Sequence, residues 1–192
     1  MRMGWLAFSA VLLLGAPSLA EQAVEAPDPL LGCWTHIYDA AHLAKHPGQK
    51  VTALTLAISA REPQGDSDPG KYLAKVTAKM RNAGDTYSNL DGSRCSLAGD
   101  RLSCVTDGFF IGKFSLAPAA KNMKLVLKGD EHLALVPGVD LAGFAVLSAE
   151  NPEHALFLLQ PAAATACGAP ARRLSPERAA RRCSRLARSL PC

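Results

Sequence analysis

The sequence predicts an all-β fold: an antiparallel up-and-down β-barrel of roughly eight to ten short strands, followed by a C-terminal α-helical extension. Three features of the 192-residue chain lead to this prediction. Apolar and polar residues alternate in several short segments, which is typical of strands with one buried face. Turn-forming residues separate these segments at near-regular intervals. Beyond residue 160 the alternation gives way to an arginine-rich segment.

The stretch from residue 92 to 136 shows the strand pattern most clearly. Met123, Leu125 and Leu127 fall on one face of a strand, and Lys124 and Lys128 fall on the other. Alternation with a period of two residues places one row of side chains in a core and the other row in water. We therefore predict a β-meander in this stretch.

A tight turn within the meander lies between two cysteines. Ala98, Gly99 and Asp100 offer the positive φ and the side-chain hydrogen bonding that hairpin turns need. A hairpin with this turn places Cys95 and Cys104 on adjacent antiparallel strands. We therefore predict a structural disulfide between Cys95 and Cys104.

Two further strands are predicted nearer to the N-terminus, in residues 51–59 and 71–81. The first alternates throughout, whereas the second fits either a strand or a helix. As a helix it would stack Lys71, Lys75 and Lys79 at i,i+4 spacing, which like charges disfavour. We therefore interpret residues 71–81 as a strand.

The last strands are predicted in residues 143–148 and 155–160. Up-and-down closure would bring the last strand, near Phe157, beside the first strand, near Trp34. After the first strand, residues 39–45 are expected to form about two turns of helix, with the aspartate at the first position as N-cap.

The first strand carries a Gly-x-Trp sequence at Gly32 and Trp34, at the start of the meander. In this it resembles lipocalins and related calycin barrels. The resemblance implies that Trp34 plugs one end of the barrel and that Gly32 is structural. It also implies a binding function, since exported bacterial inhibitors of proteases and lysozymes are built on small barrels of this general type.

The N-terminus predicts export. Arg2 precedes an apolar run over residues 5–15, and small residues at 18–20 match a signal-peptide cleavage site. A lipidated Cys33 is an alternative that we disfavour, because a polar segment separates it from the apolar run. We therefore expect a periplasmic or secreted protein with no transmembrane segment after cleavage.

The chain is predicted to divide into five parts: a signal peptide (1–20), a polar leader (21–30), a β-barrel domain (31–160), a linker (161–174) and a basic C-terminal helix (175–192). All six cysteines follow the predicted cleavage site, and an even count in an exported chain indicates disulfides. Cys183 and Cys192 would lie about 13 Å apart on a continuous helix, too far to bond. Each is therefore expected to bond Cys33 or Cys167, which would clamp the tail across the closure of the barrel.

Charge is distributed unevenly along the chain. Residues 172–192 carry seven arginines and one glutamate, whereas residues 21–171 carry 13 basic and 16 acidic residues. On a helix, five arginines form one stripe that could bind an anionic partner: Arg178, Arg181, Arg182, Arg185 and Arg188. We favour a structural tail with this stripe in water or against the acidic barrel. In an exported protein nucleic acid is not an expected partner.

Three histidines form a candidate metal site. His42 and His46 are spaced i,i+4, which places both rings on one face of a helix, and His36 or Asp39 could supply a third ligand. The competing interpretation is a solvated loop that contains three histidines, and we favour that interpretation because ligand geometry is demanding.

The sequence contains no nucleophile elbow, no glycine-rich phosphate loop and no Cys-x-x-Cys pair. We therefore predict a non-enzymatic binding protein without catalytic residues or a cofactor. It would hold a small apolar ligand in the barrel, or bind an exported partner protein at the rim, with inhibition as one form of the latter. The alternative is a periplasmic protein that binds metal through His36, His42 and His46.

Overall fold

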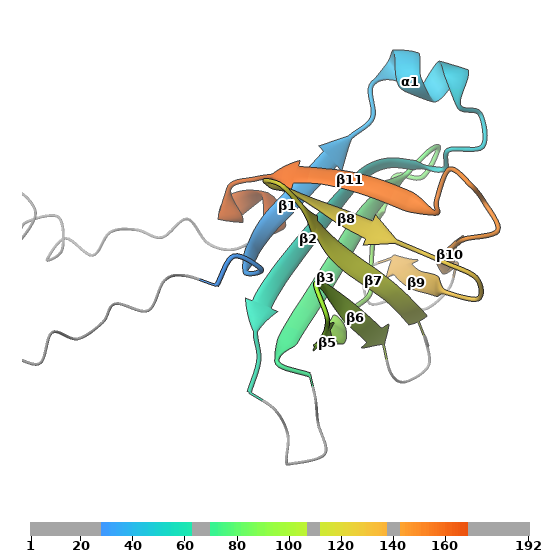
Figure 1. The fold of residues 1–192 in the computed structure, drawn as a ribbon. Helices are drawn as coiled ribbons and strands as arrows, with labels where there is room; N and C mark the ends of the chain where they lie inside the picture. The colour runs from blue at the N-terminus through green and yellow to red at the C-terminus, as the bar shows by residue number, and fades with distance from the viewer. Residues whose placement is uncertain (1–27, 63–69, 107–111, 138–142, 169–192) are drawn as a thin grey trace, which may run out of the picture.

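The computed structural model describes residues 28–62, 70–106, 112–137 and 143–168. In this part of the chain, eleven antiparallel strands form one continuous sheet, accompanied by two short helices (Figure 1). The strands are β1 (Gly32–Ile37), β2 (Val51–Ala60), β3 (Tyr72–Met80), β4 (Thr86–Ser88), β5 (Ser93–Ala98), β6 (Arg101–Thr106), β7 (Gly112–Ala119), β8 (Asn122–Val126), β9 (His132–Pro137), β10 (Ala145–Ser148) and β11 (Leu156–Pro161). The helices are α1 (Ala40–Lys45) and the 3-10 helix η1 (Ala164–Cys167).

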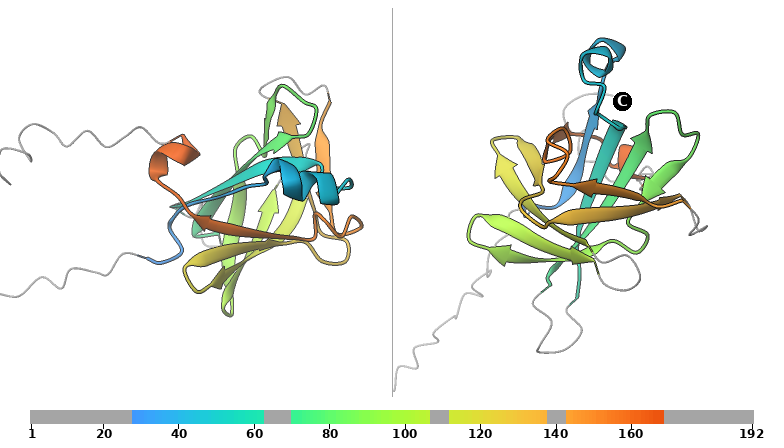
Figure 2. Two further views of the ribbon diagram at one scale, coloured as in Figure 1. Left: turned by 90° about the horizontal axis from the view of Figure 1, so that it is seen from above. Right: turned by 90° about the vertical axis from the view of Figure 1, so that its right-hand side faces the viewer.

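Eight of the strands close into a barrel in the order β1-β2-β3-β5-β6-β7-β8-β11 (Figure 2). The circle is completed where β5 pairs with β3, with Cys95 opposite Tyr72, and where β11 pairs with β1, with Pro161 opposite Trp34. Because the strands follow sequence order around the circle, the barrel is of the up-and-down type. The predicted all-β barrel is confirmed, as is the prediction that the last strand lies beside the first.

The two ends of the barrel differ. At the Trp34 end, β1 begins, β11 ends, β2 ends, β3 begins, and turns join β5 to β6 and β7 to β8. At the opposite end, which we call the helix end, α1 joins β1 to β2 and projects from the barrel (Figure 1). The predicted N-cap of this helix is present, since Asp39 Oδ1 accepts a hydrogen bond from the backbone N–H of His42 at 2.7 Å. The strands β4, β9 and β10 extend the sheet at the helix end.

Strand β3 changes partner along its length, and the buried side chain of Asn89 bridges the change. The first half of β3 pairs with β5, and the second half pairs with β4. Between the two, Asn89 Oδ1 accepts from the N–H of Val76 at 2.8 Å, and Asn89 Nδ2 donates to the carbonyl of Ala74 at 3.0 Å. The amide therefore satisfies backbone groups of β3 that would otherwise be buried without partners.

The interior of the barrel is a packed core. Inward-facing side chains from all eight barrel strands form one buried cluster, of which Phe114 and Phe157 are the bulkiest fully buried members. The alternation predicted from sequence is confirmed along the strands: in β8, Met123 and Leu125 are buried while Lys124 is exposed. Residues 72–80 form β3, so the interpretation of this segment as a strand is also confirmed.

Trp34 belongs to the core cluster at the end where β1 begins, and it is 6% exposed. Its ring folds back over Gly32, where a Cβ would lie 3.2 Å from Trp34 Cη2. A side chain at Gly32 would therefore displace the indole, which gives a physical reason for glycine at the first position of this Gly-x-Trp sequence.

Two disulfides tie the barrel together. Cys95 is directly opposite Cys104 and bonded to it, which confirms the predicted hairpin register. Cys33 is bonded to Cys167 in η1. The prediction that Cys183 and Cys192 each bond Cys33 or Cys167 is therefore wrong. The reason is that the chain passes from β11, beside β1, directly into η1, which brings Cys167 next to Cys33 without any part of the tail.

Several predicted features fall outside the described residues. They are the signal peptide (1–20), most of the leader, the basic helix (175–192), Cys183, Cys192 and the arginine stripe of Arg178, Arg181, Arg182, Arg185 and Arg188. The predicted linker differs from expectation where it is described. Its first residue, Pro161, ends β11, and two residues separate Pro161 from the start of η1 at Ala164.

Candidate functional site

Two surface pockets adjoin strand β10 at the helix end of the barrel, and both share Val146. The first, which we call the end pocket, lies at the start of β10 and has a volume of about 370 Å³. Its lining consists of Lys50, Met80, Arg81, Ala83, Tyr87, Gly143, Phe144, Ala145, Val146, Leu147 and His154. The second, the hairpin groove, lies at the end of β10 and also has a volume of about 370 Å³. Its lining consists of Gly129, Asp130, Glu131, His132, Val146, Ser148 and Glu150.

The end pocket combines an apolar floor with a cationic edge. Leu147 is fully buried in the core, and Tyr87 packs against the core from the pocket side. Lys50 and Arg81 contribute the positive charge. The Arg81 guanidinium donates to the carbonyl of Leu43 at 2.6 Å, which fixes the end of α1 beside the pocket. The pocket therefore suits an apolar group that carries or adjoins a negative charge.

His154 is the buried polar group at the base of the end pocket, with 2% of its surface exposed. Its Nε2 accepts a hydrogen bond from the backbone N–H of Lys50 at 3.3 Å, and Asn151 Nδ2 lies 3.4 Å from the same atom. Burial lowers the pKa of His154, and the nearby Lys50 charge lowers it further. The neutral ring thus joins the start of β2 to the connection between β10 and β11.

We expect stability to depend on pH through His154. Because the folded-state pKa of His154 lies below its ordinary value of 6.5, the folded state binds fewer protons than the unfolded state just below that pH. The contribution of His154 is therefore complete above about pH 6.5 and declines as the pH falls below it. Urea unfolding of the wild type at pH 7.5 and pH 5.5 should show this loss of stability.

The matched variants are His154→Phe and His132→Gln, since His132 is a partly exposed histidine of the same region. The pH dependence between 7.5 and 5.5 should shrink in His154→Phe and persist in His132→Gln. An unchanged dependence in His154→Phe would show that another group causes it.

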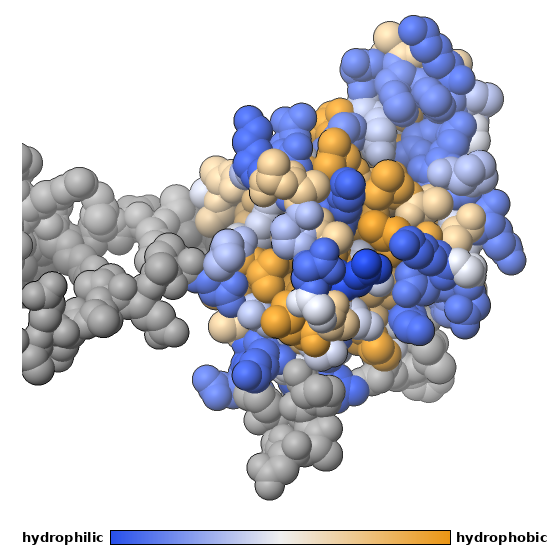
Figure 3. Space-filling model, viewed as in Figure 1, coloured by the Kyte–Doolittle hydropathy of each residue, from blue (hydrophilic) through white to orange (hydrophobic). Residues whose placement is uncertain are grey.

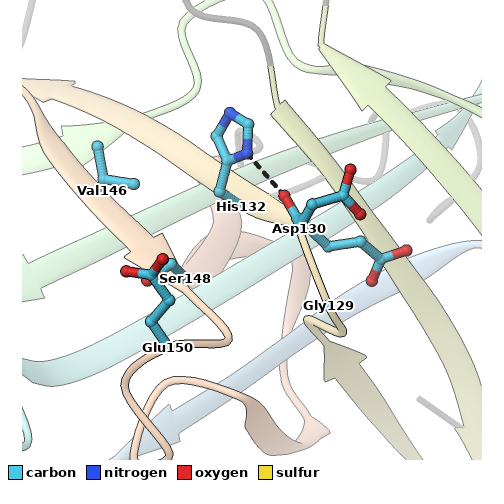
Figure 4. Close-up of a pocket in the computed structure, with 7 residues that line it drawn as sticks. Gly129, Asp130, His132, Val146, Ser148 and Glu150 are labelled. Carbon is cyan, nitrogen blue, oxygen red and sulfur yellow. Dashed lines mark hydrogen bonds between the residues drawn. The ribbon is translucent and has the colours of Figure 1, made fainter.

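The hairpin groove is acidic. Figure 4 shows the side chain of Glu150 on one side and that of Asp130 on the other, with His132 between them. His132 Nδ1 lies 3.1 Å from the carbonyl oxygen of Asp130. The carboxylate of Glu131 accepts from the N–H of Lys128 at 3.0 Å and so stabilises the turn between β8 and β9. Asp130 and Glu150 are both exposed and give the groove its negative charge.

Large apolar side chains are exposed singly at Leu31, Leu97 and Val105, and in groups at two further places on the barrel. Phe144 and Val146, at β10, are 56% and 46% exposed and line the end pocket. Ile37, Leu156 and Leu158 are exposed on the outer wall formed by β1 and β11. The space-filling view shows hydrophobic surface over this wall below the largely hydrophilic α1 (Figure 3). Only the residues at β10 adjoin described pockets.

The three predicted metal ligands do not converge. The rings of His42 and His46 stack at 4.2 Å between centroids, and Tyr38 lies between His36 and His42, at 4.3 Å and 4.7 Å. His46 Nδ1 lies 3.5 Å from a carboxylate oxygen of Glu153. Within the described ranges, no group of three or more histidine, cysteine or acidic side chains is arranged to hold a metal ion. The row of rings instead covers one side of α1.

Comparison with protein-family models, with curated proteins and with solved structures finds no match to this chain. The eight-strand antiparallel barrel is consistent with a lipocalin-like fold. In the described part of the chain, neither α1 nor η1 is long and apolar enough to cross a membrane. The two disulfides indicate an oxidising, extracytoplasmic location.

Sequence reasoning did not identify the residues around β10 as a site. The run over residues 143–148 was predicted only as a strand, although Phe144 and Val146 on one face without a neighbouring charge could have indicated an exposed apolar row. No local signal links Lys50, Arg81 and Asp130 to this strand, because the three come from other segments of the chain.

Proposed function

We propose that this protein is an exported, non-enzymatic barrel that binds a partner protein at the rim of its helix end. The observation that carries the proposal is the contrast between the barrel interior and the surface at β10. The interior is occupied by packed side chains such as Phe114 and Phe157, whereas Phe144 and Val146 are exposed beside two pockets. Apolar side chains rimmed by charged groups are typical of protein-binding surfaces.

Export is supported by two independent features. The predicted signal peptide would direct the chain out of the cytoplasm, and the disulfides Cys33–Cys167 and Cys95–Cys104 suit an oxidising compartment. A periplasmic or secreted protein follows, and its partner would be exported too.

The resemblance to lipocalins supports a binding role, but the packed interior favours the rim as the binding surface in place of the inside of the barrel. An eight-strand barrel is about the size at which the interior either holds one small ligand or is filled by side chains. Here the core cluster fills the described interior, so binding at the rim is favoured over an apolar ligand inside. Inhibition of an exported enzyme is one form that rim binding would take. Metal binding through His36, His42 and His46 is not favoured, because their rings lie in a row.

The proposal is tested by affinity purification of the mature chain from the extracytoplasmic fraction of its own host. Val146→Lys places a charge in the apolar row at β10, where Val146 is 46% exposed. Leu158→Lys makes the same change on the outer wall, where Leu158 is 43% exposed. We expect one protein to be recovered in stoichiometric amount with the wild type and with Leu158→Lys, but not with Val146→Lys.

Native mass spectrometry of the same samples separates the alternatives. A partner lost only in Leu158→Lys would move the site to the outer wall. A small-molecule adduct in place of a partner protein would favour a ligand in the barrel, and a bound metal ion would favour the histidines.

A further inference from the structure

We propose that β10 is a docking edge on which an extended segment of a partner protein adds as an antiparallel strand. The segment would carry a basic side chain towards its N-terminal end, apolar side chains at alternate positions, and an acidic side chain towards its C-terminal end. This inference rests on the proposed function, since it names the kind of segment that the rim of the helix end binds.

The first argument is the position of β10 in the sheet. It is the terminal strand of the order β10-β9-β4-β3, and its pairing with β9 runs without a register shift over all four residues. Its other edge pairs with no strand of the described residues. Natural edge strands are usually protected by shortness, charged residues, proline or a bulge. Ala145–Ser148 is short, at four residues, but it contains no charged residue, proline or bulge. The edge therefore offers backbone donors and acceptors to an added strand.

The second argument is the row of side chains beside this edge. Phe144, Val146 and Ser148 occupy alternate positions and so share one face, while Leu147 faces the core. An added strand places its own alternate side chains next to this row. Its apolar residues would then contact Phe144 and Val146, and one would reach the end pocket.

The third argument is the charge at the two ends of β10. Lys50 and Arg81 line the end pocket at the start of the strand, and Asp130 and Glu150 line the hairpin groove at its end. An antiparallel partner has its N-terminal end beside the end of β10. Its basic side chain would therefore meet Asp130 and Glu150, and its acidic side chain would meet Lys50.

A second copy of the chain fits this surface less well. Pairing of two β10 strands about a two-fold axis at Val146 would place Ser148 of each copy opposite Phe144 of the other. The apolar end pocket would then face a hydroxyl, and Phe144 would lie at the acidic end of the other copy. A partner segment with an apolar residue at this position is the better match.

The test uses two synthetic peptides with blocked termini and the full mature chain. The first has two lysines, then valine, threonine, valine, threonine and phenylalanine, and then two glutamates. The second has the same core with the glutamates first and the lysines last. We expect the first to bind at least roughly tenfold more tightly at low salt, because several charge pairs change from attractive to repulsive. The difference should shrink as the salt concentration rises.

Variants locate the effect on the protein. Glu150→Lys should weaken the first peptide and reduce its advantage over the second. The matched control is Asp100→Lys, in the hairpin between β5 and β6, where the side chain is 92% exposed; it should leave both affinities unchanged. Methylation of alternate peptide nitrogens should abolish binding if the segment adds as a strand.

Three results would overturn the proposal. They are equal affinity for the two peptides, no binding of either at millimolar concentration, and unchanged binding after methylation in both registers. A dimer of the chain alone that Val146→Lys dissociates would show that a second copy occupies the edge. If one of these results is obtained but a host partner is still lost in Val146→Lys, the proposed function stands and only the strand-addition mode of binding is rejected.

Discussion

Removal of the Cys33–Cys167 disulfide by Cys33→Ala and Cys167→Ala is expected to lower the free energy of unfolding by about 5 kcal/mol. The bond joins residues separated by 134 positions, so it closes nearly the whole barrel into one loop. In the chain-entropy model the stabilisation grows with loop length, to about 5 kcal/mol for a loop of this size. Urea unfolding of the double variant under non-reducing conditions measures the loss.

The Cys95–Cys104 disulfide is the matched control, because its separation is only nine residues. The corresponding double alanine variant should lose about 2–3 kcal/mol in the same model. An equal loss for the two bonds, or a larger loss for the short one, would contradict the view that Cys33–Cys167 acts through closure of the long loop.

Trp34→Ala is expected to destabilise the protein by about 3–5 kcal/mol, as truncation of a large core side chain usually does. Trp34 is 6% exposed and packs with the core cluster at the end where the first and last strands meet. Its loss leaves a cavity at the seam of the barrel. Unfolding followed by circular dichroism measures the effect without relying on the indole fluorescence.

Leu97→Ala serves as the control, since Leu97 is 61% exposed in the β5–β6 hairpin. It should change stability by no more than about 0.5 kcal/mol. A loss of less than about 1 kcal/mol for Trp34→Ala would show that the indole does not close the Trp34 end.

The barrel could be predicted from sequence because its strands carry local signals. The alternation around Met123 and Lys124 and the turn at Gly99 are patterns over a few residues, and both determine structure within their own segments. The pairing of Cys95 with Cys104 follows from one hairpin. Its register needs no knowledge of the rest of the chain.

The remaining features depend on contacts between distant segments. Cys33 meets Cys167 because β11 pairs with β1, and this closure is a property of the whole barrel. Likewise β4, β9 and β10 leave the barrel where β3 changes partner beside Asn89, and this change depends on tertiary pairing. His154 gave no signal in sequence, because its burial depends on the start of β2, about a hundred residues away.

The same reasoning explains the candidate site. Val146 was predicted as part of a strand, but its position on a sheet edge depends on tertiary pairing. The metal prediction used only the i,i+4 spacing of His42 and His46, which does fall on a short helix. Spacing does not determine whether a third ligand points to the same centre, and Tyr38 lies between His36 and the other two.

The most direct test of the central claim, binding at the rim and not in the interior, is a backbone amide NMR titration of the mature chain. The titrants are laurate, as a small apolar ligand, and the peptide with N-terminal lysines. We expect the peptide to shift the resonances of Ala145–Ser148 and their neighbours, and laurate to leave those of Phe114 and Phe157 unchanged. Saturable shifts of Phe114 and Phe157 with laurate, without any effect of the peptide on β10, would contradict the account.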